Sequence, residues 1–303
     1  KRRNRGNHIM VNIIRVVWAV LMSVYGYFFI KDYRQVSAAG ELEDVSVGKA
    51  GFIGFLTNFL DTLGIGSFAP TVALNKFMKM GVRDKELPGL LNVADTLPVM
   101  VEAVIFTTVI EVEPITLISM LAAAALGSYL GAGVIARMDE LKVQKVMGLA
   151  LLITAIVMVF KQLGLIQGGG DAIGLTGIRL VIGVVGNFIL GALMSAGIGL
   201  YAPCMALVYF LGMSPQVAFP IMMGSCATLM PVGSVKFIKE GAYPRKAALI
   251  IALSGAVGVY IAATFVSNLP MNILTWLVIA VIFYTSASML MAANKASKSV
   301  ETK

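Results

Sequence analysis

The 303-residue chain is 58% hydrophobic and only 13% charged, whereas about 25% of the residues of an average soluble domain are charged. This composition excludes an ordinary soluble domain and indicates an all-α integral membrane protein, because the apolar runs are long and do not alternate with period two. The net charge of +8 comes from basic residues in the polar segments between these runs, so it is a topology signal and does not indicate a nucleic-acid partner.

The chain begins with a basic tail at 1–5 and an apolar run at 11–30, followed by a polar segment at 31–49. The run lacks a small-residue cleavage site, so it is not predicted to be a cleavable signal peptide. It also has no counterpart in the second half of the chain. We therefore expect residues 1–50 to form an accessory helix and a linker that precede the main domain, residues 51–303.

The main domain begins with an interrupted helix. Residues 51–63 and 67–80 both have helical character and are separated by Gly64-Ile65-Gly66, with Ser67 as the expected N-cap and Pro70 in the new first turn. Each arm of about 13 residues covers about 20 Å, which is short of the roughly 30 Å of a membrane core. We expect a re-entrant hairpin or a helix broken at mid-membrane.

Full spans follow this segment, and the same order of elements then recurs after a glycine-rich linker at 168–171. The apolar runs after the first interruption lie at 88–109, 115–136, 146–160, 178–210, 218–235, 247–266 and 273–291. The run at 178–210 is interrupted like the first segment, so the halves share one plan.

The interruption Gly64-Ile65-Gly66 returns in the second half as Gly197-Ile198-Gly199. Chance matching of small residues in apolar sequence is the alternative to an internal repeat, but the matches extend well beyond the glycines. We predict two repeats, at 51–161 and 178–291, as in many transporters. Equivalent pairs include Pro70 and Pro203, Phe55 and Phe188, and, beyond a two-residue slip, Gly127 and Gly258.

The loop charges favour an inverted relation between the two repeats. If each interrupted segment returns to its own side, most of the Lys and Arg residues lie on the cytoplasmic side, whereas a parallel arrangement divides them evenly. The inverted arrangement places the basic tail outside if the run at 11–30 crosses fully. A non-spanning first helix would keep the tail inside.

The two interruptions predict a binding site near the membrane midplane. Non-helical backbone at that depth is tolerated only where it is buried in protein or lines a water-filled path. The arms that follow would direct free N–H groups and the positive ends of helix dipoles at one space, which suits a small anion. We expect Gly64, Gly66, Ser67, Gly197 and Gly199 to line this site; close helix packing by small residues is the alternative.

Small polar residues on the spans that follow each interruption are further candidates for the substrate site. These are Asn92 in the first half and Ser225, Cys226 and Thr228 in the second. For Cys226, plain packing is the alternative reading of a buried thiol.

Two carboxylates lie inside apolar runs with no basic residue within a helical turn, namely Asp61 and Asp95. Asn58 shares a helix face with Asp61 one turn before the first interruption. Ionisable groups in spans are costly and indicate function, so we expect Asp61, Asp95 and Asn58 to bind H⁺ or Na⁺ as a coupling ion. A structural hydrogen-bonded pair is the alternative; Glu102 and Lys236 are expected to snorkel at helix ends.

The two Gly-Ile-Gly turns, each with its proline, resemble the TauE/SafE sulfite-exporter family of bacterial permeases over about residues 51–290. Ser67-Phe68 and Leu200-Tyr201 stand where further glycines are usual in that family. The resemblance implies a multi-pass protein of the bacterial inner membrane that transports a small sulfur-containing anion such as sulfite, thiosulfate or a sulfonate.

Other classes of protein lack support in the residues. Two cysteines and one histidine give neither a disulfide framework nor a metal cluster. Nucleotide-binding motifs and nucleophile triads are missing from the sequence, so we expect no enzyme, no primary pump and no cofactor. A secondary transporter working by alternating access is the favoured reading, in contact with membrane lipid and of undetermined oligomeric state. A passive anion channel and a non-transporting scaffold are the alternatives.

Overall fold

The computed structural model describes residues 2–63, 65–106, 112–165, 170–265 and 271–301. These residues are largely helical and contain no strand beyond one isolated bridge between Ala172 and Met213, which confirms the all-α class. In chain order the elements are α1 (Arg2–Ala38), α2 (Val47–Thr62), α3 (Phe68–Phe77), the short 3₁₀ helix η1 (Asp84–Glu86), α4 (Leu87–Phe106), α5 (Pro114–Ile135), α6 (Glu140–Gln162), α7 (Gly177–Met194), α8 (Tyr201–Phe210), α9 (Pro215–Lys239), α10 (Arg245–Phe265) and α11 (Met271–Glu301).

Seven helical segments of the described residues are long and apolar enough to cross a membrane. This finding confirms a multi-pass membrane protein, and the segments correspond to apolar runs of the sequence. They are Asn12–Ala38, Asp84–Ile105, Pro114–Ile135, Glu140–Gln162, Gly177–Met194, Pro220–Lys239 and Arg245–Thr264.

Helices α2 and α3 form an antiparallel pair around the first interruption. The Ser67 hydroxyl donates to Asp61 (Oγ to Oδ2, 3.1 Å), and the Thr71 hydroxyl donates to Thr57 (Oγ1 to Oγ1, 3.0 Å). Later residues of α3 therefore contact earlier residues of α2, so the two helices are antiparallel. The first arm is longer than predicted, with 16 residues, because the helix starts before the apolar run, where the Ser46 hydroxyl caps it.

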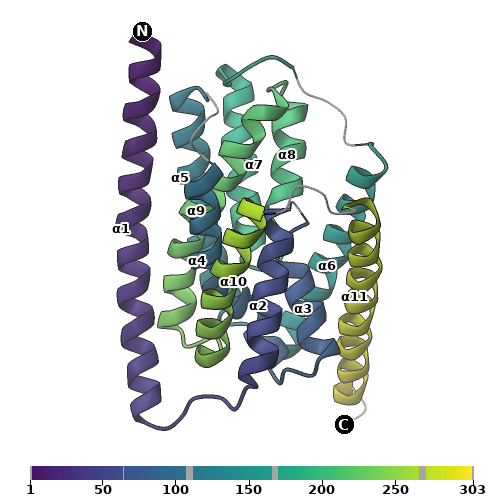
Figure 1. Cartoon of the computed structure of the whole chain (residues 1–303). Helices are drawn as coiled ribbons and strands as arrows, with labels where there is room; N and C mark the ends of the chain where they lie inside the picture. The colour runs from purple at the N-terminus through teal and green to yellow at the C-terminus, as the bar shows by residue number, and fades with distance from the viewer. Residues whose placement is uncertain (1, 64, 107–111, 166–169, 266–270, 302–303) are drawn as a thin grey trace.

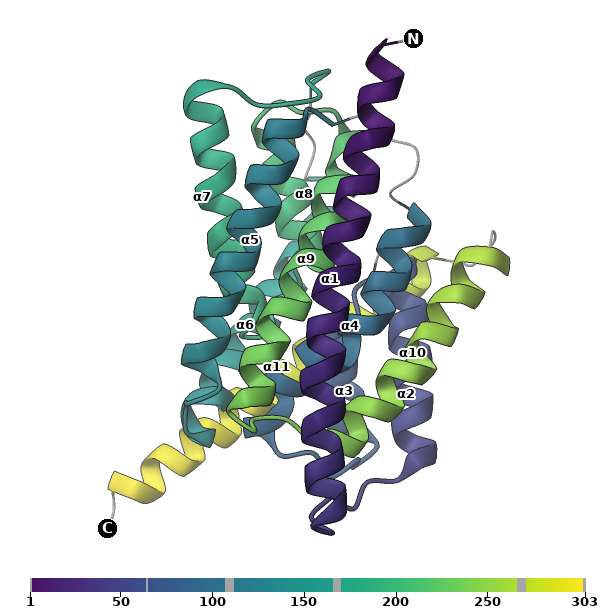
Figure 2. The same ribbon diagram turned by 90° about the vertical axis from the view of Figure 1, so that its left-hand side faces the viewer.

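Helices α7 and α8 repeat this plan around the second interruption. The Leu207 side chain of α8 packs against Gly186 of α7, so these two helices also lie side by side. In both views of the molecule the α2–α3 pair lies in the lower part of the bundle and the α7–α8 pair in the upper part (Figures 1 and 2). We call residues 63 and 65–67, between α2 and α3, the first tip, and residues 195–200, between α7 and α8, the second tip.

In each half, a helix packs against a helix of the other half. Helix α2 packs against α10 of the other half, and α7 packs against α5, while α4 contacts α9 at the centre. The same residue pairs make both outer contacts: a Cβ added to Gly258 would overlap the carbonyl oxygen of Phe55, and one added to Gly127 would overlap that of Phe188. These are the positions that the sequence repeat matched, and only glycine permits such close approach of two helices.

Helix α1 runs along the outside of the bundle (Figures 1 and 2) and packs on α9 and α4. Trp18, only 2% exposed, donates from its indole nitrogen to Thr228 Oγ1 on α9 (3.0 Å). The Tyr25 hydroxyl donates to the Val93 carbonyl on α4 (2.8 Å). Helix α1 therefore bridges one helix of each half.

Ion pairs gather at the end of the bundle that lies lowest in Figure 1. Arg245, which starts α10, contacts Asp32 near the end of α1 (Nε to Oδ2, 3.0 Å), and Arg137 contacts Glu240 after α9 (Nη2 to Oε1, 2.7 Å). The N-terminus of α1 lies at the opposite end (Figure 1). The basic tail and the basic loops are thus at different ends of the molecule.

Candidate functional site

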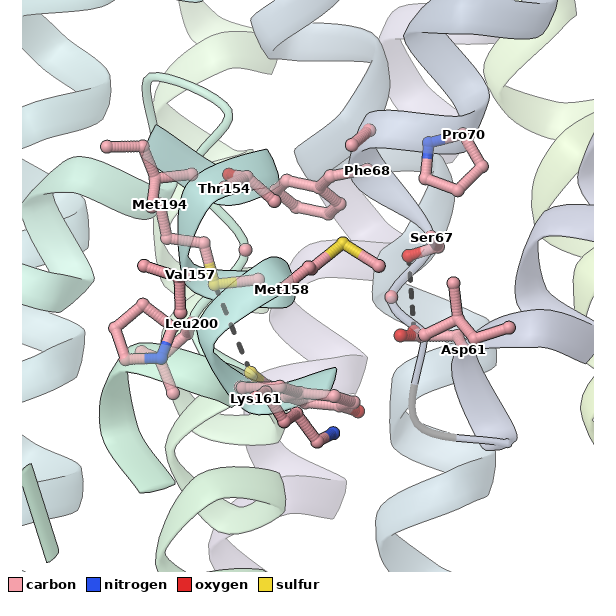
Figure 3. Close-up of a pocket in the computed structure, with 18 of the residues that line it drawn as sticks. Asp61, Ser67, Phe68, Pro70, Thr154, Val157, Met158, Lys161, Met194 and Leu200 are labelled. Carbon is pink, nitrogen blue, oxygen red and sulfur yellow. Dashed lines mark hydrogen bonds between the residues drawn. The ribbon is translucent and has the colours of Figure 1, made fainter. Parts of the chain in front are cut away.

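A central cavity of about 270 Å³ lies between the two tips and against one face of α6. Figure 3 shows Asp61 and Ser67 of the first tip region across from Met194 and Leu200 of the second, with side chains of α6 between them. Ligand pockets of this kind are concave and mostly apolar, with a few polar groups. The walls are formed by Asp61, Leu63, Ile65, Gly66, Ser67, Phe68, Ala69, Pro70, Val99, Ile153, Thr154, Val157, Met158, Lys161, Gln162, Met194, Ile198, Gly199, Leu200, Tyr201, Pro203 and Cys226.

The first tip places a hydroxyl and a carboxylate in the cavity wall. Ser67 occupies the predicted N-cap position of α3, but its side chain does not cap the helix; it donates to Asp61 instead. The backbone N–H groups of the first turn of α3 therefore have no side-chain cap, and the positive end of the helix dipole is directed at the cavity. Asp61 is only 5% exposed.

The second tip carries an aromatic hydroxyl that the sequence analysis did not single out. Tyr201 starts α8, lines the cavity and donates from its hydroxyl to Glu102 on α4 (Oη to Oε2, 2.7 Å). Glu102 is 1% exposed, and its Oε1 has no hydrogen-bond partner among the described residues. The expectation that Glu102 snorkels at a helix end is therefore wrong, because α8 covers it.

Helix α6 supplies the third wall, which the sequence analysis treated as an ordinary span. Thr154, Val157, Met158 and Lys161 are spaced as one face of a helix and line the cavity (Figure 3). Lys161 places a basic group in the cavity wall. The sequence predicted an anion site from the two tips alone, without a basic residue. Its spacing of seven residues from Thr154 is the signal that could have found it.

The tip glycines differ in what they do. Gly66 and Gly199 line the cavity, and a Cβ added to either meets no atom within 4 Å. Gly66 has a φ of +95° and Gly197 a φ of +99°. Both values lie in the left-handed region that favours glycine. Gly197 is not in the cavity wall; it packs against the Met147 side chain. Gly64 lies outside the described residues.

Asp95 and Asn58 lie together but outside the cavity wall. The Asn58 amide donates to the carboxylate of Asp95 (Nδ2 to Oδ1, 3.0 Å). Both side chains are fully buried, and each keeps one oxygen, Asn58 Oδ1 and Asp95 Oδ2, without a hydrogen-bond partner among the described residues. The structure thus joins these two predicted residues into one pair, in electrostatic range of Asp61.

The four small polar candidates are placed in different surroundings. Cys226 lines the cavity and its thiol contacts Met194 (Sγ to Sδ, 3.9 Å). The other three lie outside the cavity wall and have partners elsewhere: Asn92 donates to the Pro88 carbonyl, Ser225 accepts from Asn187, and Thr228 accepts from Trp18.

The long apolar helices define a polytopic membrane protein, and its cavity lies between two interrupted helices. Residues 179–303 match the family Sulfite exporter TauE/SafE, which confirms, over the second half of the chain, the resemblance seen in the sequence. The match covers α7 from its third residue onward through α11. No curated protein and no solved structure matches the chain.

Proposed function

We propose that the protein is a secondary transporter that moves a small anion by alternating access, with the central cavity as its substrate site. The observation that carries this proposal is that both tips and Lys161 line one cavity. A lysine and the N-terminal ends of α3 and α8 supply positive charge and N–H donors from three sides. An anion placed there would replace its water shell with these groups.

The lining of the cavity suits a sulfur oxyanion or a small sulfonate. A volume of about 270 Å³ accommodates an ion of this kind. Phe68, Val157 and Met158 form apolar walls that would contact the organic part of a sulfonate. The family description names sulfite, which belongs to the same chemical class.

Alternating access rests on an inverted relation between repeats 51–161 and 178–291. The tips approach the cavity from opposite ends of the bundle (Figure 1), and the helix exchange of α2 with α10 and of α7 with α5 is the same in both halves. Rocking of one half against the other could open the cavity to each side in turn. The end that carries the ion-paired basic loops would be cytoplasmic, and the basic tail of α1 would then lie outside.

Coupling to a cation would use Asp61 together with the Asn58–Asp95 pair. A bare carboxylate in the cavity wall would repel an incoming anion, and a bound H⁺ or Na⁺ would remove this repulsion. The oxygens of Asn58 and Asp95 that lack partners are the type of ligand that a hard cation accepts.

Flux measurements in proteoliposomes test the proposal. Sulfite, thiosulfate, methanesulfonate and acetate are compared with and without an imposed pH or sodium gradient. We expect concentrative uptake of at least one sulfur anion, and its loss in Lys161→Met. Lys145→Met removes an exposed lysine from the same helix and should behave as the parent. Flux that ignores both gradients would instead indicate a passive channel, and no flux of any anion would indicate a scaffold.

A further inference from the structure

Each tip directs a hydroxyl group at a buried carboxylate, and both carboxylates belong to the first half of the chain. Ser67 donates to Asp61 at the first tip, and Tyr201 donates to Glu102 at the second. The proposed coupling mechanism uses only Asp61 of these two. The Glu102 pair differs because it crosses between the halves, from α4 to the first residue of α8.

The surroundings of Glu102 favour a proton. Its Oε1 is buried without a hydrogen-bond partner among the described residues, and an ionised carboxylate with an unpartnered oxygen is costly in a dry site. The groups that interact with it are acidic or neutral: Asp61 from α2, Tyr201 from α8 and Cys226 from α9. Asp95 precedes it on α4. Helix α1, which also packs on α4, carries a buried basic group, the guanidinium Nε of Arg15.

Tyr201 links this carboxyl group to the cavity. A phenol has one O–H to donate, and in the structure that hydrogen is committed to Oε2 of Glu102. If Glu102 takes up a proton, its carboxylic O–H can donate to the phenol oxygen. The phenol hydrogen is then free to turn toward the cavity that Tyr201 lines.

We propose that Glu102 is a proton-binding site and that Tyr201 is a switchable donor, so that a proton on Glu102 frees the Tyr201 hydroxyl to bind an anion in the cavity. One proton thus enters the site with one anion. The anion part of this inference rests on the proposed function, whereas the proton site can be tested without any substrate.

Infrared difference spectroscopy of the purified full chain, titrated from alkaline to acidic pH, tests the proton site. The parent should gain a carbonyl band of a protonated carboxyl that is missing in Glu102→Gln and displaced in Tyr201→Phe. Glu41→Gln and Tyr260→Phe alter exposed side chains and should keep the band that Glu102→Gln lacks. Identical titrations of parent and Glu102→Gln would overturn the proton site. If Glu102→Gln does not fold, the displacement in Tyr201→Phe decides.

Binding of thiosulfate and methanesulfonate at both ends of the titration tests the switch, because the charge of these probes stays constant. The parent should bind more tightly at acidic pH. The variants are made in an Asp61→Asn background, which removes the pH response proposed for Asp61. There Glu102→Gln, which is neutral at every pH, should lose the remaining dependence, and Tyr201→Phe should bind about tenfold more weakly at acidic pH, the scale of one hydrogen bond to a charged group. If Glu102→Gln in that background keeps the same pH dependence as Asp61→Asn alone, the switch is overturned. A parent that binds neither probe overturns the proposed function and the switch together, while the infrared titration still decides on Glu102.

Discussion

The α-carbon of Gly258 on α10 lies against the backbone carbonyl of Phe55 on α2, with no room between them for a side chain. A methyl group added at position 258 must push the two helices apart. We expect Gly258→Ala to lower stability by about 1–3 kcal/mol through overpacking, measured as thermal unfolding in detergent. Gly26→Ala is the control, because a Cβ at that helix position meets no atom; it should leave the midpoint unchanged or raise it. Equal midpoints in the two variants would contradict the close contact.

The inverted arrangement predicts that the loops after the two hairpins face opposite sides of the membrane. Cysteine is introduced at Lys85, before α4, and at Ser214, before α9, in a chain whose two native cysteines are buried. We expect an impermeant thiol reagent applied to intact cells to label Ser214→Cys only, and Lys85→Cys to react after the membrane is opened. Labelling of both positions from the same side would rule out the inversion.

Gly66 and Gly199 should respond differently to substitution although they occupy matching positions in the repeats. Gly66 has a positive φ and Gly199 does not, so a side chain at position 66 strains the backbone by about 1–3 kcal/mol. We expect Gly66→Ala to lower the unfolding midpoint and Gly199→Ala to leave it unchanged. Valine at either position projects into open space beside the cavity and should abolish transport in a protein that still inserts. Full transport by both valine variants would show that transport does not depend on glycine at these two positions.

Substitution of Asp61 or Asp95 should abolish coupling to a cation gradient and leave anion binding intact. Asp61→Asn and Asp95→Asn imitate the neutral forms of the two carboxyl groups without changing their size. We expect both variants to keep anion binding or exchange and to lose accumulation driven by an imposed gradient. Thr62→Ser, one residue after Asp61 and outside the cavity wall, serves as the control. Parental accumulation by both asparagine variants would place the coupling site elsewhere.

Only part of the candidate site could be predicted from the sequence. The two interruptions and Asp61 were found because their signals are local: Gly-Ile-Gly breaks a helix, and a carboxylate in an apolar run is costly wherever the run packs. Asn92, Ser225 and Thr228 were predicted as site residues because they are small polar residues on the spans that follow the interruptions. Their side chains have partners outside the cavity, because successive positions on a helix face different neighbours.

The sequence by itself determined the membrane class and the approximate positions of the helices, since these depend on the length of apolar runs and on backbone-breaking residues. Tertiary structure decided that α6 closes the cavity with Lys161, that Tyr201 reaches Glu102 and that Asp95 pairs with Asn58. The physical reason is that each of these contacts joins helices far apart in the chain. Which face of a helix meets which partner is set by packing between helices, and hydropathy along one helix does not encode it.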